Sequence, residues 1–181
     1  MQALLLIDTQ NEFSADGLRP VPNHTAALAR IQAHVERARR EKRPIAFVLH
    51  HNRPDEWPAF KPGSWGTELS PGLDVQTQFG PEKQFVKDVF GAFSGTDLEA
   101  WLRQIGADEV LVVGFYSHMC VSTTAREGLM RGFRVLIDPE ATGTRALELD
   151  GLARQSADEV RRSAVLHLVS MGVSVLAAGS R

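Results

Sequence analysis

The chain of 181 residues lies within the usual size of one domain and can bury a full hydrophobic core without disulfide bonds. Its formal net charge of -2, with both signs scattered along the sequence, gives no electrostatic reason to expect nucleic acid or an anionic membrane as a partner. The single cysteine, Cys120, cannot form an intrachain disulfide, which favours a reducing compartment. We therefore expect one cytoplasmic domain, residues 1–181, with a small molecule as its ligand.

The first apolar run, residues 3–7, has no basic region before it and is too short for the core of a signal peptide. It therefore predicts a buried strand. No later apolar run approaches the roughly 20 residues that a membrane-spanning helix needs, so no membrane segment is expected.

Short apolar runs recur along the chain, and helical patterns separate most of them. This alternation predicts an α/β domain in which the runs form buried, mainly parallel strands. The runs are residues 3–7, 45–49, 110–115, 133–137 and 173–177.

Three helices are predicted from apolar periodicity and end signals. The first covers residues 25–40, with one apolar and one arginine-rich face. Residues 96–99 match a capping box that starts a helix running to Ile105, before Gly106. The third covers about residues 156–171 and stops at Gly172.

The stretch of residues 52–84 is rich in proline, glycine and polar residues and predicts a long loop. It carries three large aromatic residues, Trp57, Phe60 and Trp65. These could seal the edge of the core or a subunit interface, or they could line a pocket. The sequence leaves both interpretations open.

Polar residues follow several of the predicted strands. In an open α/β sheet, ligands bind beyond the carboxyl ends of the strands, where these residues should meet. They are Asp8, His50, His51, Cys120 and Asp138.

Cys120 follows a predicted strand and turn and immediately precedes a predicted helix, residues 121–131. A thiol at a helix N-terminus is expected to have a lowered pKa, which favours the nucleophilic thiolate. The alternative is a structural role, because free cysteine is among the most buried residue types.

Asp8 and Lys87 each allow a structural and a functional interpretation. An aspartate after a strand often caps the next turn, but beside a thiol it could accept the thiol proton and later activate water. A lysine is usually a solvated surface charge, and only a partner would give Lys87 a functional role.

Three segments together resemble the isochorismatase-like cysteine hydrolases over almost the whole chain. Residues 6–13 (LIDTQNEF) resemble the family's opening strand and acidic turn, and residues 86–96 (VKDVFGAFSGT) resemble its lysine segment. Residues 114–125 (GFYSHMCVSTTA) resemble its nucleophile turn and helix. Their joint occurrence in this order is specific, whereas each motif alone would be weak evidence.

The resemblance implies a single three-layer α/β/α domain with a mainly parallel sheet. It further implies that Asp8 is the general base, Lys87 the charged residue that orients the pair, and Cys120 the nucleophile. A non-proline cis peptide is expected between Phe115 and Tyr116, and the backbone N–H groups of Tyr116 and Cys120 would form the oxyanion hole.

The expected reaction is hydrolysis of a C–N bond, of amide or carbamoyl type, through a Cys120 thioester. Neither half of this reaction requires a cofactor. Vinyl ether hydrolysis of the isochorismatase type is the alternative, because residues 116–118 resemble the corresponding turn of those enzymes. A non-catalytic binding protein is the third interpretation.

No metal site is expected, because the nicotinamidase branch of the family carries an Asp-x-His pattern that residues 48–55 lack. Adjacent histidines at a strand end, such as His50 and His51, point in opposite directions and make a poor ligand pair.

The family's usual assembly implies a homodimer or homotetramer. Pocket walls in the family come from variable loops and neighbouring subunits. The candidate substrate contacts are therefore Phe13, Trp57, Phe60, Trp65, Phe93 and His118.

Overall fold

The computed structural model describes residues 1–176 and has a six-stranded, fully parallel sheet at its centre. The strand order is β3-β2-β1-β4-β5-β8. This confirms the predicted α/β class with its mainly parallel sheet. The strands are β1 (Gln2–Ile7), β2 (Ile45–His50), β3 (Glu82–Lys87), β4 (Glu109–Phe115), β5 (Arg134–Gly143) and β8 (Ser174–Val175).

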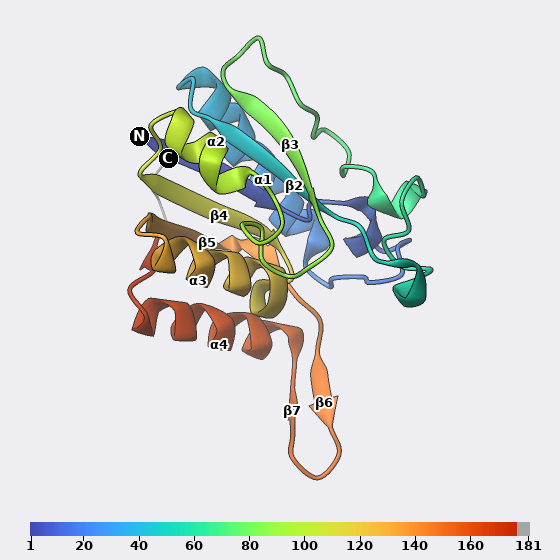
Figure 1. Ribbon diagram of the computed structural model, residues 1–181. Helices are drawn as coiled ribbons and strands as arrows, with labels where there is room; N and C mark the ends of the chain where they lie inside the picture. Colours follow the sequence, from blue (N-terminus) through green and yellow to red (C-terminus); the bar gives the residue numbers. More distant parts are fainter. Residues whose placement is uncertain (177–181) are drawn as a thin grey trace.

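Helices cover both faces of the sheet and give it three layers (Figure 1). Helix α1 (His24–Arg40) packs on one face, where its apolar stripe joins one buried cluster. Helices α2 (Leu98–Gln104), α3 (Ser122–Met130) and α4 (Ala157–Ser170) contribute side chains to a second cluster on the other face.

The two-residue period of the central strand explains why there are two buried clusters. Along β1, Leu4 and Leu6 face α1, whereas Leu5 and Ile7 face the other helices. Successive side chains of a strand point to opposite faces, so a strand covered on both sides must be apolar throughout. This is the pattern that the run of residues 3–7 predicted.

Strand β3 (Glu82–Lys87) was not predicted, because its residues carry little apolar character. Within residues 1–176 it pairs only with β2 and is an edge strand. Phe85 packs in the core while the neighbouring Val86 is 45% exposed. An edge strand needs only one buried face, so a segment with few apolar residues can form one. The end of the predicted loop is therefore part of a strand that ends at Lys87.

The two predicted helix starts behave differently. Helix α2 begins after Asp97 without a side-chain cap, and Thr96 Oγ1 instead accepts from the Leu98 N–H at 3.2 Å. The predicted capping box is therefore absent there. Helix α4 has one that the sequence interpretation passed over, since Ser156 and Glu159 cap each other's backbone N–H groups.

A hairpin of β6 (Leu147–Leu149) and β7 (Ala153–Gln155) was also not predicted. It projects away from the body of the molecule (Figure 1). The last predicted strand, residues 173–177, is found as the two-residue β8, and its final position lies outside the described residues.

Short 3-10 turns occupy the loops that surround the carboxyl ends of the strands. They are η1 (Asn11–Phe13), η2 (Pro54–Glu56) and η3 (Trp65–Thr67). Among residues 1–176, none of the helices has the length and apolar character needed to span a membrane.

Candidate active site

Four polar side chains meet at the carboxyl ends of the central strands. Asp8 follows β1, His50 ends β2, Lys87 ends β3, and Cys120 lies in the turn after β4. Each residue is at most 7% exposed. Such a concentration of polar groups inside a core is costly unless the groups bind each other or a ligand.

Asp8 adopts a left-handed backbone conformation, with φ of 52°. This conformation is uncommon for non-glycine residues, although aspartate tolerates it better than most. Its N–H donates to the Val48 carbonyl, and its own carbonyl accepts from the Gln10 N–H, both at 2.8 Å. The turn therefore fixes the carboxylate at the end of the strand.

The Asp8 carboxylate is only half satisfied. Its Oδ2 accepts from the Lys87 ammonium at 2.9 Å, but its buried Oδ1 has no hydrogen-bond partner among the described residues. An unpartnered carboxylate oxygen can accept a proton from a bound group or from water.

Lys87 is completely buried and contacts every other member of the group. Its Nζ lies 2.9 Å from Asp8 Oδ2 and 3.2 Å from His50 Nδ1, and its charge acts on the neighbouring Cys120 thiol. Burial alone would lower the pKa of Lys87, but Asp8 and Cys120 together raise it above its ordinary value. The lysine therefore stays charged, with Asp8 and His50 as its hydrogen-bond acceptors.

Cys120 lies in a π-helical turn, Ser117–Val121, that leads directly into α3. π-turns inside helices occur frequently at functional sites. The turn places the thiol beside Asp8 and Lys87, so that the charges of both act on it.

The resting thiol differs from the sequence-based expectation of a lowered pKa. Burial and the negative charge of Asp8 raise the pKa of Cys120, and the opposing charge of Lys87 does not compensate. The thiol is therefore protonated at rest. A nucleophilic sulfur would have to lose its proton to a neighbouring base during attack, which is a role that Asp8 Oδ1 can fill.

His50 links Lys87 to the loop that follows β2. A lysine ammonium can only donate, so the His50 Nδ1 must accept from Lys87, and the ring proton lies on Nε2. That nitrogen donates to Asn52 Oδ1 at 2.7 Å. Burial and the charge of Lys87 lower the pKa of His50, which is consistent with this neutral tautomer.

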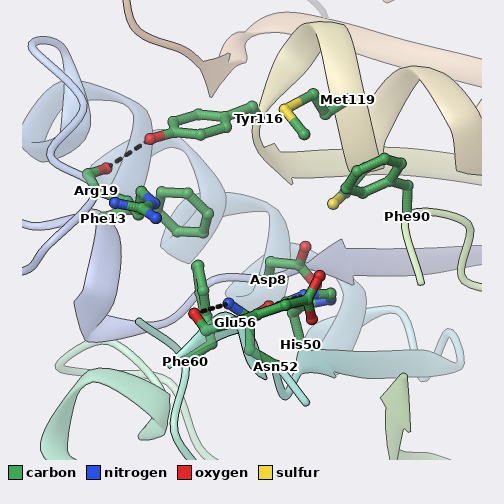
Figure 2. Close-up of a pocket in the computed structure, with 11 residues that line it drawn as sticks. Asp8, Phe13, Arg19, His50, Asn52, Glu56, Phe60, Phe90, Tyr116 and Met119 are labelled. Carbon is green, nitrogen blue, oxygen red and sulfur yellow. Dashed lines mark hydrogen bonds between the residues drawn. The ribbon is translucent and has the colours of Figure 1, made fainter. Parts of the chain in front are cut away.

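A cavity of about 360 Å³ opens directly onto Asp8 and Cys120. We call it the Cys120 cavity. In Figure 2, Asp8, His50 and Asn52 lie on one side of this space, with Tyr116 and Met119 on the other. Its walls are Asp8, Phe13, Arg19, His50, Asn52, Glu56, Phe60, Phe90, Tyr116, Met119 and Cys120.

Two of the six predicted contact residues line this cavity. Phe13 and Phe60 pack with ring centroids 5.2 Å apart, and Phe13 also meets the edge of Tyr116 at 4.8 Å. The three rings therefore form one continuous aromatic wall.

The other four candidates lie outside the Cys120 cavity. Trp57 and Trp65 are 42% and 49% exposed, because their loop turns them toward solvent. Phe93 is buried in the core against Phe133. His118 stacks on the Tyr116 ring and bonds Thr144 Oγ1 through Nδ1 at 2.6 Å.

The peptide bond between Phe115 and Tyr116 is cis, as the resemblance implied. The Tyr116 hydroxyl donates to the Arg19 carbonyl at 3.0 Å and ties this wall to the loop after η1 (Figure 2).

Five lining residues were missed by the sequence interpretation: Arg19, Asn52, Glu56, Phe90 and Met119. Four of them lie in loops, where no periodic signal indicates which side chain points inward. Met119 directly precedes Cys120 and could have been found from that position.

His50, and not His51, lines the cavity. No group of three or more His, Cys, Asp or Glu side chains that could hold a metal ion is found among residues 1–176.

Comparison with known proteins identifies the family. The isochorismatase domain model matches residues 2–164, which is most of the chain. This chain therefore belongs to the isochorismatase family. The match, the parallel sheet and the presence of hydrolases among its relatives define an enzyme of the hydrolase class.

Individual relatives agree with this placement. The chain is 34% identical over 142 residues to a secreted isochorismatase effector of Verticillium dahliae, covering 78% of this chain and 72% of the relative. It is 32% identical over 152 residues to Nicotinamidase 3 of Arabidopsis thaliana, covering 78% and 73%. An isochorismatase structure from Pseudomonas putida superposes with a TM-score of 0.87 at 27% identity, covering 96% of this chain and 86% of that one.

Proposed function

We propose that the protein hydrolyses a C–N bond of amide or carbamoyl type in a small molecule, with Cys120 as nucleophile. The observation that carries this proposal is a buried thiol and a half-satisfied carboxylate on the wall of one cavity, with a buried ammonium bonded to that carboxylate. The similarity to a nicotinamidase supports an amide-type bond.

In the proposed first step, Asp8 removes the thiol proton as the Cys120 sulfur attacks the carbonyl carbon. The carbonyl oxygen becomes an oxyanion that the N–H groups of Tyr116 and Cys120 stabilise, each donor typically contributing about 3 kcal/mol. The C–N bond then breaks, and the leaving amine takes the proton from Asp8.

In the second step, Asp8 accepts a proton from water while the water oxygen attacks the thioester carbon. The C–S bond breaks, the acid product leaves, and the thiol regains its proton. Lys87 remains charged throughout, which orients Asp8 and stabilises negative charge on the sulfur.

The cellular location and the oligomeric state of the protein are part of the same proposal. A nucleophilic thiol must stay reduced, which supports a cytoplasmic location. We further propose a homodimer or homotetramer, without nucleic acid or membrane partners.

The test is a substrate panel of small amides, ureas, carbamates and isochorismate, followed by mass spectrometry of the rapidly quenched enzyme. Release of an amine together with an acyl adduct on the peptide that contains Cys120 is expected. Turnover of isochorismate without an adduct, retained by Cys120→Ala, would replace this proposal with vinyl ether hydrolysis.

A further inference from the structure

Two arginines beside the Cys120 cavity differ from most others in this protein. Arg30, Arg39 and Arg161, for example, each bind a carboxylate. Among the described residues, the guanidinium groups of Arg19 and Arg145 form no ion pair. Their only hydrogen bonds are long ones, of 3.3 and 3.4 Å, to adjacent backbone carbonyls.

The two arginines share a hollow of about 670 Å³ that adjoins the catalytic space. We call it the arginine hollow. Arg19, Tyr116 and Met119 line both this hollow and the Cys120 cavity. Arg145 lines the hollow but not the cavity. A molecule whose reactive carbonyl reached Cys120 could therefore extend past the Tyr116 ring toward both guanidinium groups.

The charges around the cavity favour one orientation of such a molecule. Glu56 and Asn52 lie together on the wall across from Tyr116 and Met119 (Figure 2). A negative group would be repelled by Glu56 and attracted to the arginines. The Asp8 carboxylate at the cavity is paired with the buried Lys87 ammonium, so this ion pair does not change the polarity.

The buried carboxylate of Glu12 interacts electrostatically with Arg19. Burial raises the pKa of Glu12, although Arg19 acts in the opposite direction. Glu12 forms no ion pair with Arg19, so the guanidinium remains available to a ligand.

We propose that Arg19 and Arg145 form an anion-binding subsite and that the substrate is a small acyl or carbamoyl compound with a carboxylate on an apolar body. This inference rests on the proposed function and names its substrate class. The planar guanidinium fork matches a carboxylate, and the rings of Phe13, Phe60 and Tyr116 suit the apolar body.

The charge preference can be measured at Cys120 without any turnover. Iodoacetate and iodoacetamide both alkylate the Cys120 sulfur: a bond forms between the sulfur and the CH2 carbon of the reagent, and iodide leaves. The two reagents differ only in carrying a carboxylate or a neutral amide. Because Cys120 is the only cysteine, intact-protein mass spectrometry reports its alkylation rate directly. Measuring both reagents at one pH cancels the thiolate fraction from the rate ratio.

We expect the iodoacetate-to-iodoacetamide rate ratio to fall about five- to tenfold in Arg19→Met/Arg145→Met and to fall in the wild type at high salt. Arg40→Met is the matched control. Arg40 is an exposed arginine at the end of α1, near the amino ends of the strands, and its loss should leave the ratio unchanged. Equal ratios in wild type and double variant would overturn the proposal.

A binding measurement covers the case of a thiol too buried to alkylate. Titration with 3-phenylpropionate and 3-phenylpropionamide should give an acid affinity at least about fivefold higher than that of the amide in wild type, and no difference in the double variant. Equal affinities in the wild type would also overturn the subsite. A charge preference without amide hydrolysis would reject the proposed function alone, and hydrolysis without a charge preference would reject the subsite alone.

Discussion

Asp8 and Asp138 are both buried aspartates at the carboxyl side of the sheet, yet their surroundings differ. Asp138, in β5, accepts from Arg30 Nε at 2.6 Å and bonds His34 Nε2 at 2.7 Å through Oδ2. Its Oδ1 accepts from the Glu140 N–H at 3.0 Å. Both oxygens are therefore satisfied, whereas Asp8 Oδ1 has no partner among the described residues.

The difference teaches how a structural carboxylate can be told from a reactive one. Asp138 holds α1 against β5 and is not among the residues that line the Cys120 cavity. Asp8 keeps an open acceptor beside a thiol and a cavity. Free acceptor capacity next to a space for ligand, and not burial or position along a strand, separates the two aspartates.

Cys120→Ala should have the largest effect on turnover, a loss of about a thousandfold or more, because the nucleophile is removed. The fold should remain, since only one sulfur is lost from the core. Steady-state kinetics and thermal unfolding measure the two effects. Near-normal turnover of a folded variant would contradict covalent catalysis.

Asp8→Asn should reduce turnover by about a hundred- to ten-thousandfold, because an amide cannot take the thiol proton. The charge of Asp8 also raises the pKa of Cys120, so its removal should lower that pKa. The pH profile of iodoacetamide labelling should therefore shift to lower pH while turnover is lost. An upward shift, or retained turnover, would show that Asp8 does not act as described.

Lys87→Met should lower turnover less than Asp8→Asn and shift the labelling profile in the opposite direction, to higher pH. Lys87 opposes the rise in the pKa of Cys120, and the variant loses that opposition. Removing one partner of a buried pair also typically costs about 3–5 kcal/mol of unfolding free energy. Lys87→Arg keeps the charge and should rescue part of both effects.

If the labelling profiles of wild type, Lys87→Met and Lys87→Arg coincide, Lys87 is not coupled to the thiol. Chemical denaturation of the same three proteins separates a change in stability from a change in reactivity.

His50→Leu should lower turnover by about tenfold, because Lys87 loses one of the two acceptors that position its ammonium. His50→Gln offers a carbonyl oxygen in a similar place and should retain more activity. Burial and Lys87 lower the pKa of His50, so the neutral ring should persist through neutral pH. Equal activity of the Leu and Gln variants would remove the positioning role.

Asp138→Asn should leave turnover within about twofold of wild type and reduce stability by about 1–3 kcal/mol. Although burial opposes ionisation, hydrogen bonds from His34 and Arg30 hold the pKa of Asp138 below its ordinary value. A depressed pKa stabilises the fold above the unfolded-state pKa, about 3.9, and this contribution is lost as pH falls.

The stability difference between Asp138→Asn and wild type should therefore be full near pH 7 and shrink below about pH 4. Urea unfolding at several pH values measures it. A large loss of turnover in a folded Asp138→Asn protein would break the distinction between the two aspartates.

The sequence by itself determined the α/β class and most of the sheet. The runs at residues 3–7, 45–49, 110–115 and 133–137 all form strands, because strands covered on both faces must be apolar throughout. The motifs around Asp8, Lys87 and Cys120 also identified the family, because residue types in a fixed order are read directly from the chain.

Tertiary structure alone decided the features that depend on environment. The sequence predicted a lowered thiol pKa from the adjoining helix, but burial beside Asp8 reverses the direction. It also missed β3, whose formation depends on pairing with β2 and on burial of Phe85.

The choice of pocket residues was decided in the same way. Phe60 lines the cavity while Trp57 and Trp65, from the same loop, face solvent. Loop composition does not specify direction, because the backbone turns that aim each side chain are fixed by packing against distant segments. Among the described residues, the free oxygen of Asp8 and the absence of ion pairs at Arg19 and Arg145 likewise depend on which groups the fold brings within hydrogen-bonding distance.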